Sequence, residues 1–372
     1  MRVFSSAVLL LLAATAPTFA ADDHSGRTNI RDYGALCNGT NDDTSAFKAA
    51  IAAAPFGGVV FVPPGNCVVS DTLDIKNNLV SIVGDGLGSQ IFQQSDKTLL
   101  RLTNTAALMI KNLFLGSAAT SVGTALIDLT NSHRNRIDNV SMLGSYHGLH
   151  LNGSLLNTVV DLRSGVNFSQ LFFAASQIVT PNQYWVYAEP YAATGISANA
   201  NTFIAPVLEG GTNGIFIKDG NGQGSLQLVG GTIEGVTGIG LQFHGTFLPS
   251  SVTGIDFEDN GQDIVIDGSS NIRMSAINSV SGAVIPPAPI VSLTGDTRNV
   301  QISDSSVDSI FVGPKTKRIV LQNITSGLAG GPFANVSLPS VSVIPAGSPT
   351  DPYPGPITNI TANNVGNYAA GE

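Results

Sequence analysis

One phrase occurs three times between Asn201 and Asp267. Its copies are Pro206-Val207-Leu208-Glu209-Gly210-Gly211-Thr212-Asn213-Gly214-Ile215, Gly231-Thr232-Ile233-Glu234-Gly235-Val236-Thr237-Gly238-Ile239 and Ile255-Asp256-Phe257-Glu258-Asp259-Asn260-Gly261-Gln262-Asp263-Ile264. In each copy an apolar residue precedes a glutamate, and a turn that contains Gly or Asn leads into another short apolar run. The glutamates lie 25 and then 24 residues apart, a period expected of a solenoid. If each period is one coil, the three carboxylates form a column.

The same rhythm of short apolar runs and polar turns extends from Leu79 to about Ile324. Its clearest runs are Leu79-Val80-Ser81-Ile82-Val83, Leu108-Met109-Ile110, Ala125-Leu126-Ile127-Asp128-Leu129, Ile264-Val265-Ile266 and Ile319-Val320-Leu321. No amphipathic helix of useful length interrupts them. Short parallel strands that are joined by turns rather than by helices are wound into coils. The sequence therefore predicts an all-β solenoid of roughly ten coils, at about 22 to 25 residues per coil.

The composition suits one continuous body of strands and turns. Of 372 residues, 43% are hydrophobic, 12% are charged and 41 are glycine, so the chain can build a core but carries few of the surface charges typical of exposed helices. The formal net charge of −9 argues against general nucleic-acid binding, because no basic field collects phosphates. It also mildly disfavours polyanionic substrates, although a local basic cleft can override the average.

The chain begins with the features of an export signal. Arg2 precedes an apolar core from Ala7 to Ala14, and Thr18-Phe19-Ala20 supplies the small residues of a cleavage site. We predict that residues 1–20 are a signal peptide and that the mature protein is secreted, either to the extracellular space or to a periplasm. No other run is long enough to span a membrane.

The segment that follows combines two cysteines with a short helix. Cys37 and Cys67, the only cysteines, form an even pair in an exported chain, so we expect a disulfide bond. Asn41-Asp42-Asp43-Thr44 offers an N-cap to a helix over Ser45–Ala54, and Pro55 ends it. A short helix with one apolar stripe needs a surface to lie on. We expect it to cover the open end of the coils.

This segment also resembles a known superfamily. The matching residues are Asp32-Tyr33-Gly34-Ala35, Gly39 with Asn41-Asp42-Asp43-Thr44, Phe47 to Ala50, and Gly57-Gly58-Val59-Val60-Phe61-Val62-Pro63-Pro64-Gly65. Over these residues the chain resembles the pectate-lyase-like, rhamnogalacturonase and epimerase-like superfamily of right-handed parallel β-helices. The resemblance implies a single-stranded right-handed parallel β-helix in which residues 28–70 cap the helix and build its first coils. It implies no single reaction, because such proteins include glycoside hydrolases, polysaccharide lyases, epimerases and phage tailspikes.

The C-terminal part of the chain differs in composition from the coils. We assign residues 21–325 to the β-helix and residues 326–372, which are rich in Gly and Pro, to a C-terminal cover or tail. Val341, Val343 and Ile344 are apolar, so we expect part of this cover to dock against the coils.

The expected spacing of the coils suggests a catalytic role for the glutamate column. Neighbouring parallel strands are about 4.8 Å apart, so the carboxylates would be about 5 Å apart, or about 9 to 10 Å when one coil is skipped. These separations bracket those of retaining and inverting glycosidases. Glu234 is the candidate acid and Glu209 and Glu258 are its partners, because stacked like charges favour protonation of one group. Asp256 and Asp259 extend the cluster toward substrate. The alternative is a ladder of outward polar residues that faces solvent or holds a cation.

The rhythm is interrupted between Gln177 and Asn201, where aromatic residues gather. These are Tyr184, Trp185, Tyr187 and Tyr191. We interpret the stretch as an excursion from the solenoid whose flat rings bind substrate sugars. The alternative is an aromatic patch that seals the excursion against the coil.

A lyase would need other groups. The hard oxygens that calcium prefers are offered by Asp256, Glu258, Asp259 and Asp263, so Ca²⁺ is a possible cofactor of a lyase. The candidate bases are Arg134, Arg136, His147, His150 and Arg163, with Lys218 and Arg273 further along. His147 and His150 are three residues apart, so on a strand they would point to opposite faces and would not share a ligand.

From these residues we predict a secreted enzyme that cleaves glycosidic bonds of a polysaccharide by hydrolysis, with Glu209, Glu234 and Glu258 as its catalytic group. Its partner would be a polysaccharide or oligosaccharide substrate, and hydrolysis would need no metal or other cofactor. Two alternatives stay open. One is a polysaccharide lyase that acts by β-elimination, and the other is a non-catalytic glycan-binding or structural β-helix.

Overall fold

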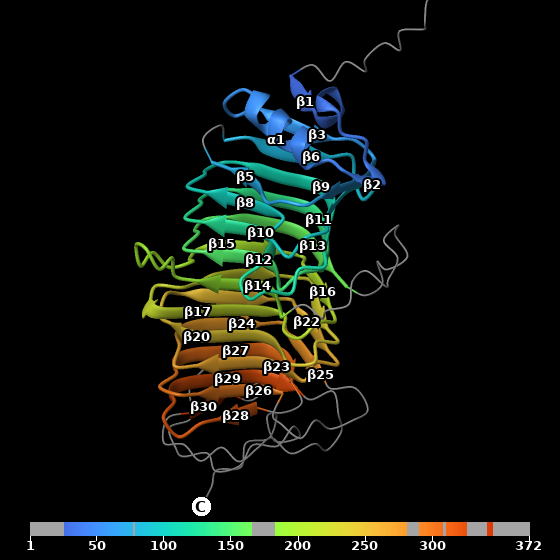
Figure 1. Ribbon diagram of the computed structural model, residues 1–372. Helices are drawn as coiled ribbons and strands as arrows, with labels where there is room; N and C mark the ends of the chain where they lie inside the picture. Colours follow the sequence, from blue (N-terminus) through green and yellow to red (C-terminus); the bar gives the residue numbers. More distant parts are fainter. Residues whose placement is uncertain are drawn as a thin grey trace, which may run out of the picture.

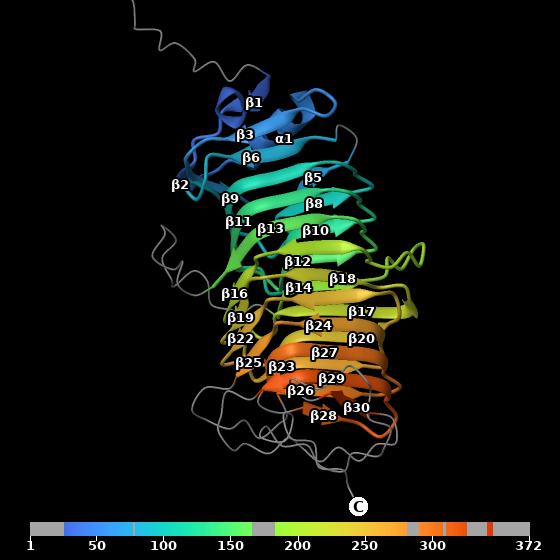
Figure 2. The ribbon, with the colours of Figure 1, turned by 180° about the vertical axis from the view of Figure 1, so that it is seen from behind.

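A computed structural model describes residues 26–76, 79–165, 183–280, 290–307, 310–325 and 341–344. Within them the chain forms a parallel β-solenoid of about 10 turns. Each turn stacks on the one before it, from the blue N-terminal end to the red C-terminal end in Figure 1, and Figure 2 shows the same stack from behind. The predicted all-β parallel β-helix is therefore confirmed.

Each coil contributes strands to three faces. The first face holds β1 (Arg27–Asn29), β3 (Val59–Val62), β6 (Ser81–Gly84), β9 (Met109–Ser117), β11 (Arg136–Gly144), β13 (Thr158–Ser164), β15 (Asn201–Ile204), β18 (Leu226–Val229), β21 (Ser250–Thr253), β24 (Ser270–Ser275), β27 (Arg298–Val307), β29 (Lys317–Thr325) and β30 (Val341–Ile344). The second face holds β2 (Asn38–Asp42), β4 (Gly65–Val69), β7 (Ser89–Gln93), β16 (Val207–Glu209), β19 (Thr232–Glu234), β22 (Asp256–Glu258) and β25 (Asn278–Val280). The long strands β9, β11, β13, β27 and β29 bend round the corner and belong to both faces.

The third face is a sheet of its own, in which strands from successive coils pair in chain order. It consists of β5 (Leu73–Ile75), β8 (Leu100–Thr103), β10 (Ala125–Thr130), β12 (His147–Asn152), β14 (Tyr184–Glu189), β17 (Ile215–Gly222), β20 (Ile239–Thr246), β23 (Gln262–Asp267), β26 (Val291–Thr294) and β28 (Ile310–Val312).

The core fills the inside of the coils, because the register places apolar residues of the same strand position on top of one another. One such column in the third face consists of Leu102, Leu129, Leu151, Ala188, Ile217, Phe243, Ile266, Leu293 and Val312. All of them are buried. The apolar runs of the sequence are therefore the inward positions of these strands.

Asparagine side chains align the turns that lead from the third face to the first. Asn135, Asn157 and Asn201 are buried in three successive coils. Asn135 Nδ2 donates to Asn157 Oδ1 at 3.1 Å, and Asn157 Nδ2 donates to Asn201 Oδ1 at 2.9 Å. Buried polar groups are tolerated when they are hydrogen-bonded, so this ladder holds the coils in register without cost to the core.

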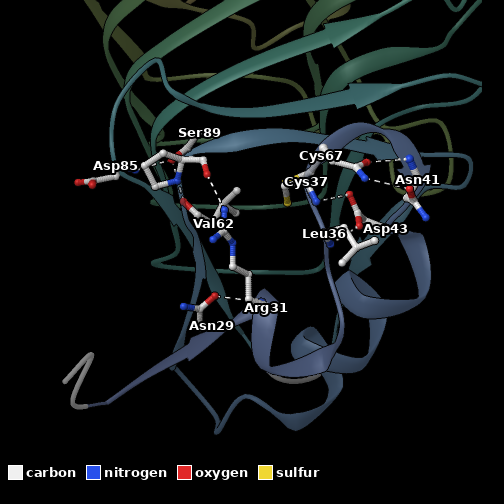
Figure 3. The surroundings of a disulfide bond; sticks show 12 residues. Asn29, Arg31, Leu36, Cys37, Asn41, Asp43, Val62, Cys67, Asp85 and Ser89 are labelled. Atoms are coloured by element: carbon white, nitrogen blue, oxygen red, sulfur yellow. Dashed lines mark hydrogen bonds between the residues drawn. A yellow bond between two sulfur atoms is a disulfide. The ribbon is translucent and has the colours of Figure 1, made fainter. Parts of the chain in front are cut away.

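The N-terminal end of the stack is covered as the sequence predicts. Helix α1 (Thr44–Ala53) contacts β5 and the short 3-10 helix η1 (Ile30–Tyr33), and it lies at the blue end in Figure 1. Cys37 and Cys67 form the expected disulfide bond. Beside it the buried Asp43 carboxylate accepts hydrogen bonds from the backbone N–H groups of Leu36 and Cys37 at 2.7 and 3.1 Å (Figure 3). The helical cap and the disulfide bond are both confirmed.

Most of the aromatic stretch is part of the solenoid, and only Tyr191 lies in the turn of residues 190–200 that follows it. Tyr184–Glu189 is strand β14, which pairs with β12 on one side and β17 on the other. The apolar rhythm is interrupted there because the outward positions hold Tyr184, Tyr187 and Glu189 rather than small polar residues. Residues 177–182 of the predicted excursion lie outside the described residues.

Two further predictions concern the ends of the chain. Residues 1–20, the predicted signal peptide, and most of the predicted C-terminal cover lie outside the described residues. Within the cover, β30 pairs in parallel with β29, as its expected docking requires. No helix in the described part of the chain is long and apolar enough to cross a membrane.

Candidate functional site

The three glutamates of the repeated phrase lie side by side on the second face. The register pairs Glu209 with Glu234 and Glu234 with Glu258. The residue before each glutamate is buried in the core: Leu208, Ile233 and Phe257. Strand alternation then turns each glutamate outward. The predicted column is present, with one glutamate on each of three successive coils.

Burial and like charges both act on this glutamate column. Burial, followed by the charges of Glu209 and Glu258, raises the pKa of Glu234 above its ordinary value. Asp256 and Asp259 add to that repulsion, although Asp256 Oδ1 also accepts a hydrogen bond from Asn278 Nδ2 at 2.7 Å. Across the described residues, no hydrogen bond reaches the carboxylate of Glu234 or Glu258. The column therefore favours a protonated acid, but no side chain holds that acid in position.

Trp185 belongs to the core, so its assignment to substrate binding is corrected. The residue is 3% exposed, and its indole Nε1 donates to the carbonyl of Gly210 at 2.8 Å, next to Glu209. A buried ring has no face on which a sugar can stack. Tyr184, Tyr187 and Tyr191 remain partly exposed.

A second cluster lies on the third face, around two histidines of β12. The ring centroids of His147 and His150 are 5.5 Å apart, so the expectation that they point to opposite faces is wrong. The reason is Gly148, where an added Cβ atom would lie 3.2 Å from Cε3 of the buried Trp185. Gly148 and Leu149 both face the core, and two successive inward positions interrupt the alternation of the strand. The histidines on either side of them therefore share the outer face.

Strand β14 repeats this pattern one coil later. The register pairs His147 with Tyr184 and His150 with Tyr187, and the two residues between the tyrosines are buried. The ring of His147 stacks on that of Tyr187, with centroids 4.8 Å apart and planes 5° apart. Tyr146 and Phe216 extend the contacts at both ends. The third face thus carries an aromatic cluster of six rings.

Carboxylates complete this histidine–tyrosine cluster. The Tyr187 hydroxyl donates to Glu189 Oε2 at 3.0 Å, and His150 Nε2 lies 3.2 Å from Glu189 Oε1. On the other side of the imidazole, His150 Nδ1 lies 3.6 Å from Asp128 Oδ1, and Arg101 Nε lies 3.5 Å from Asp128 Oδ2. The Glu189 side chain is 31% exposed, against 10% for His150 and 11% for Asp128. Glu189 and Tyr187 therefore form the accessible edge of the cluster.

These contacts set the charges of the cluster. The hydrogen bond from His150 is the largest cause that lowers the pKa of Glu189, so this carboxylate is ionised at neutral pH. Burial, and then the charge of Glu189, raises the pKa of Tyr187, so its hydroxyl stays protonated. Burial, followed by the charge of His150, lowers the pKa of His147 to about 3. His147 is therefore neutral, and its buried Nδ1 has no hydrogen-bond partner among the residues that the structure describes.

Lys218 in β17 adds an exposed positive charge. The register pairs Ala188 with Ile217, so Lys218 occupies the strand position that follows, in line with Glu189, whose pKa it helps to lower. Among the described residues, no carboxylate oxygen lies within 4.0 Å of Lys218 Nζ. Lys218 is therefore available to a negatively charged ligand.

The acidic residues considered for calcium do not converge. Asp263 is buried, and its carboxylate accepts hydrogen bonds from Ser279 Oγ at 2.6 Å and Asn260 Nδ2 at 2.9 Å. In the described ranges, the only group of three side chains close enough to hold a metal ion is Cys37, Asp43 and Cys67. Its sulfur atoms are used in the disulfide bond. The acidic residues considered for calcium therefore do not form a group that fits a resident calcium ion.

The other candidate bases do not join the cluster. Arg136 and Arg163 are ion-paired with Asp138 and Asp161 in β11 and β13. Arg273 lies in β24 of the first face, and Arg134 precedes β11.

The sequence interpretation missed Asp128 and Glu189, although a signal was present. His147 and His150 have the same three-residue spacing as Tyr184 and Tyr187. That shared spacing would have aligned the two strands and brought Glu189 beside His150, if the aromatic stretch had been recognised as a coil.

Comparison with known proteins supports the fold over most of the chain and the family over its N-terminal part. Residues 27–160 match the sequence model of the family described as rhamnogalacturonase A/epimerase, pectate lyase-like. In structure, the chain is similar to PfbA, a surface adhesin of Streptococcus pneumoniae, with a TM-score of 0.60 and 14% identity over 88% of this chain and 94% of that one. At that identity the likeness concerns the fold.

Two curated proteins of Azotobacter vinelandii are similar over a short segment. Mannuronan C5-epimerase AlgE1 is 43% identical in an alignment of 77 residues that covers 18% of this chain and 5% of the epimerase. Alginate lyase 7 is 42% identical in an alignment of 77 residues that covers 18% of this chain and 9% of the lyase. The chain thus spans less than a tenth of the length of either protein. Together with the fold, these matches indicate the pectate-lyase-like parallel β-helix superfamily, and they do not resolve a subgroup within it.

Proposed function

We propose that this chain is a carbohydrate-active enzyme that removes a proton from the sugar carbon next to a carboxylate in a uronate polysaccharide, which leads to β-elimination or epimerisation. The observation that carries the proposal is the series of contacts from Tyr187 through Glu189 to His150 at the edge of the aromatic cluster. Proton transfer needs a base within hydrogen-bond reach of the proton that it takes and an acid within reach of the atom that it protonates. Glu189 and Tyr187 supply such a pair.

Glu189 is the proposed proton acceptor. It is ionised at neutral pH and is the most exposed carboxylate of the cluster. His150 contacts it through Nε2, and Asp128 contacts the other ring nitrogen of His150. A carboxylate of lowered pKa is a modest base, so the carbon acid must be activated. Lys218 would do this by pairing with the substrate carboxylate and stabilising the negative charge that develops there.

Tyr187 is the proposed proton donor. In β-elimination the C–H electron pair forms a C=C bond, the bond to the glycosidic oxygen breaks, and the Tyr187 hydroxyl protonates the leaving oxygen. In epimerisation the proton returns to the opposite face of the carbon from water, because Tyr187 is hydrogen-bonded to Glu189 and lies on the same side of the sugar as this base, and Glu189 releases its proton to water. After elimination, Glu189 passes the proton it accepted to Tyr187 through the hydrogen bond between them, which restores both groups.

The surroundings suit a sugar. Tyr184 and Phe216 are partly exposed and contact Tyr187, and aromatic rings offer faces on which sugar C–H groups pack. The names of the two Azotobacter relatives, a mannuronan C5-epimerase and an alginate lyase, describe enzymes of this reaction class. They support uronate polymers as the substrate class for this chain.

Product analysis tests the proposal. The protein is incubated with mannuronan, alginate and polygalacturonate, and ultraviolet absorbance detects unsaturated ends, proton NMR detects epimers, and a reducing-end assay detects hydrolysis. We expect an unsaturated or epimerised product from a uronate polymer, and we expect formation of the unsaturated product to be lost in Tyr187→Phe. Tyr33→Phe, which removes a hydroxyl near the N-terminal cap, is the matched control. Neither product from any of the polymers, or full elimination activity in Tyr187→Phe, would refute the assignment.

Hydrolysis at the glutamate column is the second candidate function. One observation favours it, namely the raised pKa of Glu234 between two other carboxylates. Glu234 would protonate the glycosidic oxygen, and Glu209 or Glu258 would act as nucleophile or base. Reducing ends that form without an unsaturated product and disappear in Glu234→Gln would establish this reaction. Unchanged turnover in Glu234→Gln would leave the column as a solvent-facing ladder.

The non-catalytic alternative has its own outcome in the same experiment. A surface adhesin is among the proteins of similar fold. Binding of a polymer without any of the three products would support a glycan-binding role.

A further inference from the structure

A cavity of about 700 Å³ lies on the first face, apart from both clusters described above. It extends over β18, β21, β24, β27 and β29, and five successive coils therefore contribute to it. Its polar lining includes Gln227, Ser251, Asn271, Arg273, Gln301 and Arg318. No residue of the glutamate column or of the histidine–tyrosine cluster lines it.

The lining is ordered by the coil register in two columns. Gln227, Ser251, Arg273 and Gln301 occupy one outward position on successive strands. The second column consists of the second residues of β24, β27 and β29, which are in the left-handed conformation: Asn271, Asn299 and Arg318, with φ of 62°, 52° and 56°. Asn299 Nδ2 donates to Asn271 Oδ1 at 3.0 Å, which fixes this second column. Hydrogen-bonding groups therefore repeat along the cavity at the coil spacing of about 4.8 Å.

The charge of the cavity is opposite to that of the whole chain. Arg273 and Arg318 are exposed, and no aspartate or glutamate lines the cavity. Within the described part of the chain, no carboxylate oxygen lies within 4.0 Å of a guanidinium nitrogen of Arg273 or Arg318. The net charge of the chain is −9, so two unpaired guanidinium groups in one cavity are a local exception. Guanidinium groups favour carboxylate and sulfate ligands through paired N–H donors.

We propose that this cavity is a separate binding site for an anionic oligosaccharide that lies along the axis of the solenoid. Arg273 and Arg318 are two coils apart, which corresponds to about 10 Å along the axis, so they would pair with acidic groups on different sugar units. The neutral side chains of Gln227, Ser251 and Gln301 would bind hydroxyl groups between them.

The chemistry of the lining favours a saccharide over other polyanions. It combines the neutral amides of Gln227, Asn271 and Gln301 with the hydroxyl of Ser251. Neutral amide and hydroxyl groups suit the hydroxyls of a sugar. Two cations are too few to hold a nucleic acid against the negative charge of the chain. The site does not depend on which reaction the third face catalyses.

Calorimetric titration tests this site. The probes are hexamannuronate and the neutral mannohexaose, and the protein carries Tyr187→Phe so that turnover does not obscure binding. We expect hexamannuronate to bind and mannohexaose to bind much more weakly. The double variant Arg273→Gln, Arg318→Asn should weaken hexamannuronate binding by at least about tenfold. Asparagine is chosen at position 318 because it tolerates the left-handed conformation there.

A matched control removes the same charge elsewhere. Lys76→Gln with Arg134→Asn also removes two exposed positive charges, and Arg134 has a left-handed φ of 55° like Arg318. This control should bind hexamannuronate as the parent does, and equal thermal midpoints should show that both variants are folded. The proposal is overturned if hexamannuronate does not bind, if mannohexaose binds equally well, or if the two double variants lose the same affinity.

Discussion

The glutamate column and the histidine–tyrosine cluster are built from the same element, an outward position repeated on successive coils, yet their charges behave in opposite ways. In the column, like charges meet and raise the pKa of Glu234 beyond the effect of burial. In the cluster, unlike groups meet, and the hydrogen bond from His150 lowers the pKa of Glu189. The coil spacing of about 4.8 Å is common to both. The residue types that share a column therefore decide whether its charges repel one another or whether a hydrogen bond keeps a carboxylate ionised.

The largest expected effect is on catalysis. Glu189→Gln removes the proposed proton acceptor and should lower kcat on a uronate polymer by about 10² to 10⁴. Glu258→Gln makes the same chemical change at the exposed end of the column and should leave the rate nearly unchanged. Initial rates of both variants on one substrate measure the difference. If Glu258→Gln is the slow variant and Glu189→Gln is not, the roles of the two regions are reversed.

Trp185 connects the two regions, so its removal should disturb both. It lies under the cluster beside Gly148 and donates to Gly210 next to Glu209. Trp185→Ala would leave a cavity in the core and should lower the free energy of unfolding by about 3 to 5 kcal/mol, as measured by chemical denaturation. The control is Phe56→Ala, because Phe56 is 76% exposed and its loss should change stability by less than about 0.5 kcal/mol. Equal effects of the two substitutions would show that Trp185 is not a core residue.

Stability as a function of pH should separate Glu189 from Glu234. The folded-state pKa of Glu189 is below the ordinary value of 4.5, so its contribution is present above 4.5 and is lost as pH falls through the lowered pKa. The folded-state pKa of Glu234 is above 4.5, so the folded state loses stability as pH rises from 4.5 through the raised pKa. The two glutamates therefore affect stability with opposite signs.

Glutamine variants make this difference measurable. At neutral pH, Glu189→Gln should have a lower thermal midpoint than the wild type, and Glu234→Gln should have a higher one. Both differences should shrink in acid, because the wild-type carboxylates are then protonated. Midpoints that shift in the same direction for the two variants would mean that the charge contrast between the regions is absent.

The sequence predicted the fold more fully than the site, for a physical reason. The apolar run and turn of each coil are local, so Leu208, Ile233 and Phe257 already marked the coils and the column of glutamates that follows them. The cluster depends on a break in strand alternation at Gly148, which arises because Trp185 of the next coil fills the space where a side chain would be. His150 and Glu189 are 39 residues apart, and no local pattern pairs them. Register between distant coils was needed to find them.

The smallest expected effect concerns the titration of His147. Its pKa is lowered to about 3, first by burial and then by the charge of His150, so its ring resonances should stay constant in NMR spectra from neutral pH to about pH 4. The unfolded chain in denaturant is the control, because there the ring should titrate near the ordinary value of 6.5. Since the folded form binds this proton less readily, the folded state should lose stability as pH falls below 6.5. A ring that titrates near 6.5 in the folded protein would mean that solvent reaches His147. The histidine–tyrosine cluster would then be an open column like that of the glutamates, without the buried partners that fix the charge of Glu189.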